Sequence, residues 1–174
     1  MEFLKELLGL FTNEILLVPA FAWFVAQLLK TLINGIVNKS FSPERLFGDG
    51  GMPSGHSATV MALAMMCGFS CGFGSVEFGI AMIFAVVVMH DALGVRRETG
   101  KQAVSIIEIA TVINDYVVEK DEKVKTEKLK TLVGHTPLQV VCGALVGIII
   151  SVVYYFAFNG LFERLEAIID GWFV

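Results

Sequence analysis

Four apolar runs along the chain are long enough to be read as membrane-spanning helices. A helix needs about 20 consecutive apolar residues to cross the hydrocarbon core of a bilayer. The runs cover residues 14–37, 57–73, 76–95 and 138–158, and the second is short and rich in Met and Ala. The stretch "CGFGS" between the second and third runs is rich in glycine. It predicts a tight turn, which would make these two helices antiparallel neighbours.

Two further segments mix apolar and charged residues in a helical pattern. In residues 101–118 the polar side chains fall on one stripe of a helix, formed by Lys101, Ser105, Glu108, Thr111 and Asp115. Residues 161–174 place charged side chains among Leu, Ile, Trp and Phe. Both patterns predict amphipathic helices that lie along the membrane interface. The charged run "EKDEKVKTEKLK", residues 119–130, is typical of a solvated connector and completes an amphipathic insert over 101–130.

Composition supports the membrane interpretation. Of the 174 residues, 55% are hydrophobic and only 17% are charged, whereas about 25% are charged in an average soluble domain. The mean hydropathy is +0.71. The three cysteines lie in apolar runs without the histidines or further cysteines of a metal site, so we interpret them as small buried hydrophobes. We therefore expect an all-α integral membrane protein: one domain, residues 1–174, with about four transmembrane helices in a bundle plus interfacial amphipathic helices.

The basic residues predict the orientation of the bundle. Of the 13 Lys and Arg residues, eight lie in residues 96–130 and three more, Lys30, Lys39 and Arg45, lie in or beside the first loop. Only Lys5 and Arg164 remain for the opposite side. Because cytoplasmic loops carry the excess of Lys and Arg, both basic loops are expected in the cytoplasm and both termini outside.

Three polar clusters fall at the cytoplasmic ends of the predicted spans. "GGMPSGHSA" begins the second helix, "HDALGVRRETG" ends the third, and "GHTPLQ" begins the fourth. Two of the three histidines, His56 and His135, belong to these clusters. The topology therefore brings the clusters to one face of the bundle.

The chemistry of these clusters suits a phosphate group. Ser54 and Gly55 precede a helix N-terminus, whose amides and dipole favour an anion. Arg96 and Arg97 supply planar charged groups for phosphate oxygens, although a positive-inside anchor is the alternative for one of them. Lys30 either adds a third cation or extends to the lipid head groups.

The quoted motifs resemble a known family. "PSGHS" resembles the second signature of the type 2 phosphatidic acid phosphatase and haloperoxidase superfamily, and "GHTPLQVVCG" resembles the latter half of its third signature. The full set is most similar to the divergent bacterial and plastid branch of that superfamily, over residues 30–147. The resemblance implies a bacterial cytoplasmic membrane protein that acts on a lipid phosphate, prenyl or glycerolipid, without a metal or cofactor. Its partners would be that lipid and the surrounding membrane lipids, with no nucleic acid.

The resemblance also implies roles for individual residues. His135 would attack phosphorus and form a phosphohistidine, while His56 would protonate the leaving alkoxide. The phosphate oxygens would be held by Ser54, Gly55, Arg96 or Arg97, and Lys30 or Lys39 with Arg45. Proton transfer by such a histidine typically contributes about 10²–10⁴ in rate.

The chain departs from the superfamily pattern at several positions. The Lys–six residues–Arg-Pro signature is absent, because five residues separate Lys39 from Arg45 and Leu46 follows. Leu129 stands where an arginine is expected, and Gln139 stands where a carboxylate orients the nucleophile. A neutral amide can accept the imidazole N–H, but it cannot stabilise an imidazolium. Phosphate binding is therefore better supported than turnover, and a non-catalytic protein that binds or translocates lipid phosphates is the alternative function. A purely structural membrane subunit is a third possibility, against which the convergence of the clusters argues.

Asp91 lies about one turn inside the end of the third run, where an unpaired charge is costly. We expect it to be the structural partner of Lys30 or of an arginine. The alternative is that Asp91 replaces the missing carboxylate beside His135.

The predicted orientation can be tested by cysteine labelling. Single cysteines at Ser42 and Thr126, in a variant without the native cysteines, should resist an impermeant thiol reagent added to intact cells, because both loops are expected in the cytoplasm. They should react once the cells are permeabilised. Labelling of either position in intact cells would contradict the topology.

Overall fold

The computed structural model describes residues 7–38, 51–116 and 134–158, which form helices and turns with no strand among them. The main helices are α2 (Glu14–Asn38), α3 (Gly55–Cys71), α4 (Val76–Leu93), α5 (Val95–Tyr116) and α6 (Pro137–Phe158). The prediction of an all-α membrane protein is confirmed. Lys39, Arg45, Leu129 and the amphipathic segment 161–174 lie outside the described residues.

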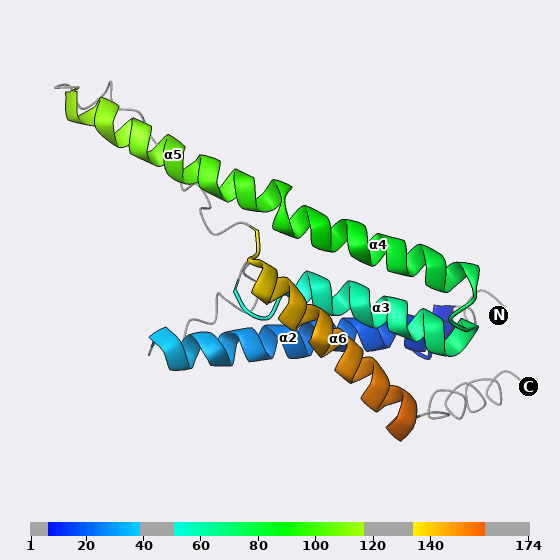
Figure 1. Cartoon of the computed structure of the whole chain (residues 1–174). Coiled ribbons are helices and arrows are strands. Elements are labelled where there is room, and N and C mark those ends of the chain that lie inside the picture. Colours follow the sequence, from blue (N-terminus) through cyan, green and yellow to red (C-terminus); the bar gives the residue numbers. More distant parts are fainter. Residues whose placement is uncertain (1–6, 39–50, 117–133, 159–174) are drawn as a thin grey trace, which may run out of the picture.

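Three stretches of the described helices are long and apolar enough to cross a bilayer. They are Glu14–Val37, the continuous stretch Val76–Tyr116, and Pro137–Phe158. The fourth apolar helix, α3, has only 17 residues, about 25 Å at 1.5 Å per residue. This is less than the roughly 30 Å of a hydrocarbon core. Although α3 is short, it packs against three other helices, α2, α4 and α6 (Figure 1).

Small residues allow α3 and α6 to approach closely. A Cβ atom on Gly143 would collide with the carbonyl oxygen of Ser54, and one on Gly147 would collide with that of Ala58. One turn further along, the Ser151 hydroxyl donates to the Gly147 carbonyl at 2.9 Å and to the Ala62 carbonyl at 3.3 Å. This Gly-xxx-Gly-xxx-Ser pattern is typical of helix pairs in membranes, where packing and hydrogen bonds replace the hydrophobic effect as the driving force.

Large apolar side chains lie on the outside of the bundle instead. On α4 the exposed fractions are between 51% and 66% for Ile80, Ile83, Phe84, Val86 and Val87. The core, by contrast, consists largely of alanines. A continuous apolar face of this kind would favour aggregation in water, so it belongs against lipid hydrocarbon.

A carboxylate ties three helices together at the end of the bundle where α2 begins. Glu14 of α2 accepts a hydrogen bond from the Ser70 hydroxyl of α3 at 2.5 Å. It accepts a second from the Tyr154 hydroxyl of α6 at 3.1 Å. Two donors from two neighbouring helices therefore pair this charge, which would be unfavourable unpaired in a membrane-spanning helix.

Helices α4 and α5 are nearly continuous. The Gly94 N–H donates to the His90 carbonyl at 2.9 Å, and the Glu98 N–H donates to the Gly94 carbonyl at 3.0 Å. In Figure 1, α5 extends from the end of α4 away from α3 and α6. The segment predicted to begin at Lys101 therefore begins at Val95, and the preceding span ends at Leu93 rather than Val95. The interfacial position of α5 stays a prediction.

The close contact between α3 and α6 predicts the effect of adding one methyl group. Gly147→Ala should lower the thermal unfolding midpoint of the detergent-solubilised protein, because its Cβ would meet α3 backbone that cannot move aside. Overpacking of this kind typically destabilises by about 1–3 kcal/mol. Gly79→Ala on α4 is the matched control, since no atom lies within 4 Å of the added Cβ. Equal midpoints for the two variants would contradict the interpretation.

Candidate functional site

The loop before α3 forms a capped helix N-terminus. Ser54 is the N-cap: its Oγ accepts from the Ser57 backbone N–H at 3.3 Å and from the Ser57 hydroxyl at 3.0 Å. The Ser54 side chain is fully buried, so the structure gives it a capping role. The amides of Gly55 and His56 occupy the first two positions of the helix, which have no intrahelical partners. Together with the helix dipole, they favour an anion.

Lys30 lies beside this loop, inside the bundle. A Cβ on Gly51 would lie 3.0 Å from Lys30 Cγ, and Gly51 has a φ of +92°. Glycine is therefore required both for its backbone conformation and for the close passage of the lysine stem. The Lys30 side chain is only 6% exposed, which differs from a lysine that extends along the surface to the head groups.

Lys30 belongs to a polar stripe on α2 that the sequence analysis missed. Gln27, Lys30, Thr31 and Asn34 follow the i, i+3, i+4, i+7 spacing of one helical face, and the first three are buried. The stripe faces the start of α3, because a Cβ on Gly55 would lie 3.9 Å from Gln27 Cδ. The spacing of these polar residues within an apolar run was the signal that could have identified it.

The start of α6 is a capping box. The Gln139 N–H donates to Thr136 Oγ1 at 3.4 Å, and the Thr136 N–H donates to Gln139 Oε1 at 3.0 Å. Pro137 is the first residue of the helix, a position where its missing N–H has no consequence. The sequence "TPLQ" carries the signature of this motif, so this role of Thr136 and Gln139 was also detectable.

Gln139 also contacts the proposed nucleophile. His135 Nδ1 lies 3.3 Å from Gln139 Oε1. The carbonyl identity of that atom follows from the Thr136 N–H that it accepts. A carbonyl oxygen can only accept, so a hydrogen bond between these two atoms requires the proton on Nδ1. In the neutral ring, this arrangement leaves the lone pair on Nε2.

Backbone hydrogen bonds join the three polar clusters. The His135 N–H donates to the Ala92 carbonyl at the end of α4, and the Ser54 N–H donates to the Gln139 carbonyl, both at 3.0 Å. His135 is 5% exposed, whereas His56 is exposed, and their ring centroids are 6.3 Å apart. The convergence expected from the topology is therefore present in the structure.

Gly134 fixes the approach to His135. Its φ is +88°, and a Cβ on it would collide with the backbone of Arg96 and Arg97. The chain before α6 therefore passes directly over the first turn of α5. A larger residue would displace His135 from the end of α4.

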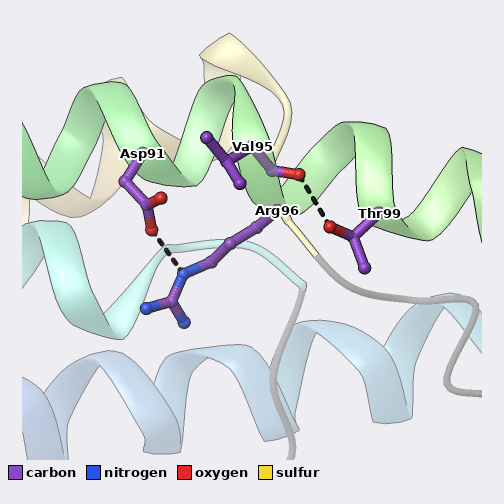
Figure 2. Close-up of polar contacts among 4 residues, drawn as sticks. All are labelled: Asp91, Val95, Arg96 and Thr99. Carbon is purple, nitrogen blue, oxygen red and sulfur yellow. Dashed lines mark hydrogen bonds and ion pairs between the residues drawn. The ribbon is translucent and has the colours of Figure 1, made fainter.

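Asp91 pairs with Arg96 across the junction of α4 and α5. The Arg96 Nε–H donates to Asp91 Oδ2 at 2.6 Å, and Figure 2 shows the two side chains reaching towards each other. The side chains are 39% exposed for Asp91 and 50% for Arg96, so the pair contributes about 0–1 kcal/mol. Of the two expected roles, partner of an arginine is the one seen. Arg97 is also exposed and has no salt bridge within the described part of the chain, so it is the arginine with more freedom to reach a ligand.

A groove elsewhere in the bundle is apolar, unlike the three polar clusters. A groove of about 370 Å³ lies between the first half of α2 and the second half of α6, lined by Leu17, Val18, Phe21, Ile149, Ile150, Val153, Tyr154 and Phe158. Its walls are almost entirely apolar. It suits hydrocarbon and offers nothing to a phosphate. Among the described residues, no three His, Cys, Asp or Glu side chains are grouped to hold a metal ion.

The comparison with known proteins decides the family. The family model described as the Divergent PAP2 family matches residues 11–150. The chain belongs to this family. A Bacillus subtilis (strain 168) protein, named uncharacterized membrane protein YuiD, is 41% identical over 155 residues, which cover 86% of this chain and 98% of that protein. No solved structure matches. The resemblance inferred from the three motifs is thereby confirmed for this Divergent PAP2 protein.

The geometry predicts which cations of this Divergent PAP2 protein bind phosphate. Orthovanadate, a phosphate analogue, should raise the thermal unfolding midpoint in proportion to occupancy. Lys30→Met, which keeps an apolar stem against Gly51, should weaken vanadate binding by roughly tenfold or more, since hydrogen bonds to charged groups are worth about 1.5–3 kcal/mol. Arg97→Ala should weaken it as well.

Lys101→Met is the matched control, because Lys101 is exposed and pairs with Glu98 at 2.6 Å. It should leave the vanadate response unchanged. Unchanged responses in both Lys30→Met and Arg97→Ala would remove these residues from the site. An inert Arg96→Ala variant in addition would exclude the arginine pair altogether.

Proposed function

We propose that this Divergent PAP2 protein is a membrane-embedded phosphatase that hydrolyses a lipid phosphate, prenyl or glycerolipid, at the cytoplasmic face through a phosphohistidine. One observation carries the proposal. His135 Nδ1 lies 3.3 Å from Gln139 Oε1, a contact that favours the Nδ1–H tautomer, and the His56 ring lies 6.3 Å away at the N-terminus of α3. Reacting atoms in a productive complex lie about 3–3.5 Å apart, so one phosphoryl group between the rings could contact both.

In the first step, the lone pair of His135 Nε2 attacks phosphorus and forms an N–P bond. The bond from phosphorus to the lipid oxygen breaks, and that oxygen takes the electron pair. His56, in its protonated form, transfers its proton to this oxygen, so the lipid leaves as an alcohol. The phosphoryl group stays on His135.

In the second step, water attacks the phosphohistidine. His56, now neutral, accepts a proton from the water as the new O–P bond forms. The N–P bond breaks, its electrons return to Nε2, and inorganic phosphate leaves. Both histidines are restored, and no redox partner is required.

Positive groups around the site would stabilise the phosphate oxygens during both steps. The amides at the start of α3 and the buried Lys30 lie on one side, and Arg97 begins the neighbouring helix α5. Such preorganised donors are usually the largest contribution to catalysis of group transfer. Arg96 is engaged by Asp91, so we assign it to positioning the α4–α5 junction.

A second function is favoured by the neutrality of Gln139. The amide favours the Nδ1–H tautomer of His135, but it supplies no negative charge to stabilise the ring as it becomes positive. In a serine protease triad, an amide in place of the acid lowers the rate by about 10⁴, in part through the wrong tautomer. A protein that binds or translocates lipid phosphates would keep the cradle without needing the charge.

Restoring the carboxylate distinguishes the two functions. Gln139→Glu preserves side-chain length, and glutamate also fits the capping box. If the protein is a phosphatase, this change should raise phosphate release from a panel of lipid phosphates by roughly tenfold or more, because the anion stabilises positive charge on His135. Adding His135→Asn should abolish the gain.

Phosphate release that survives His135→Asn would exclude the phosphohistidine. No release by the native protein or by Gln139→Glu, in preparations that still bind vanadate, would favour the binding function. One further result separates the roles of Asp91. If Asp91→Asn abolishes turnover while Arg96→Ala does not, Asp91 acts on the site rather than through Arg96.

A further inference from the structure

One polar side chain near the site has no use in the mechanism above. Gln27 of α2 is 6% exposed, and its Oε1 atom is buried without a hydrogen-bond partner among the described residues. More than nine in ten buried polar groups in proteins are paired, and an unpaired one destabilises the folded state. In a membrane-spanning helix, such a residue is a marker of function.

The position of Gln27 connects it to the phosphate site. It lies one turn from Lys30 on the same face of α2. Its amide carbon packs against Gly55, the first residue of α3, where a Cβ would be only 3.9 Å from Gln27 Cδ. The carboxamide therefore lies beside the N-terminus of α3, which would receive the anion. The terminal torsion of glutamine is soft, so the amide can turn to a ligand bound there.

A carboxamide places an acceptor oxygen beside a donor nitrogen. A fully ionised phosphate offers only acceptors and would leave the Gln27 oxygen unpaired. A singly protonated phosphate monoester offers both groups: its P–OH can donate to Oε1, and a neighbouring oxygen can accept from Nε2. A phosphodiester has no P–OH. The abundant diester lipids of a membrane would therefore leave this buried acceptor unpaired.

We propose that Gln27 is a specificity residue that selects phosphate monoesters over phosphodiesters by accepting a hydrogen bond from the P–OH group. This inference rests on the proposed phosphate site, which it deepens. A lipid that carries a hydroxyl beside its phosphate would offer Gln27 a second donor. The α3 N-terminus favours the phosphate itself, because Gln27 packs against its first residue.

The test compares two ligands of equal charge. Dodecyl phosphate at pH 5.5 is mainly a monoanion with one P–OH, because the second pKa of a phosphate monoester is about 6. Dodecyl methyl phosphate is also a monoanion, but a methoxy group replaces the P–OH. Dissociation constants are measured by thermal stabilisation in a His135→Asn background, so that neither ligand is consumed.

The ratio of the two dissociation constants should favour the monoester by about three- to tenfold more with the native Gln27 than in Gln27→Leu. This difference is the effect of one neutral hydrogen bond. Gln27→Leu should also leave unliganded stability unchanged or raised, because it removes an unpaired buried group. Thr31→Val is the matched control. The Thr31 hydroxyl, in the same stripe, donates to the backbone carbonyl of Gln27 at 2.9 Å, so its loss should not alter the preference.

The outcomes separate this inference from the proposed function. If neither ligand binds the native site, both the phosphate site and the role of Gln27 fail. If both bind and the preference is the same in Gln27→Leu, only the role of Gln27 is overturned. If Gln27→Leu lowers stability and weakens both ligands equally, Gln27 is structural and the inference is again wrong.

Discussion

The contact between α3 and α6 is the constraint on which the site depends. Two glycines of α6 lie directly against carbonyl oxygens of α3, and no larger side chain fits there. That approach is what lets the Ser54 N–H reach the Gln139 carbonyl at 3.0 Å. The capped start of α3 and the start of α6 are therefore fixed to each other by backbone atoms. This arrangement also positions the two histidines, because His56 is two residues after Ser54 and His135 directly precedes Thr136, the cap of α6.

Gln139 shows how one residue can meet several demands where polar groups must be paired. Its backbone donates to Thr136 and accepts from Ser54, while its side chain accepts from Thr136 and contacts His135. A carboxylate could make the same contacts. What the amide lacks is only the negative charge. An amide in place of a carboxylate therefore preserves these contacts and changes mainly the electrostatics of the imidazole ring.

The third polar cluster lies at the α4–α5 junction and contacts the start of α6 through backbone atoms. Gly134 passes over the backbone of Arg96 and Arg97, and the His135 N–H reaches Ala92. These contacts place the α4–α5 junction beside His135 without using any charged side chain. The exposed pair between Asp91 and Arg96 adds little stability to this arrangement.

The sequence by itself determined the helices, their approximate ends and the family. Apolar runs of spanning length can fold in a bilayer only if their backbone groups pair internally, which makes helix the outcome without reference to neighbours. Motif spacing located the two histidines, and the glycines of "CGFGS" marked the turn between α3 and α4. The capping box of α6 and the Gly-xxx-Gly pattern are also visible within a few consecutive residues, but they were not recognised from the sequence. Only the tertiary structure decided that Lys30 is buried, that Asp91 pairs with Arg96, and that Gln27 lies against Gly55 with its Oε1 atom unpaired among the described residues. The reason is physical: a side chain's burial and partner depend on which helix faces it, and periodicity along one chain does not specify the neighbour.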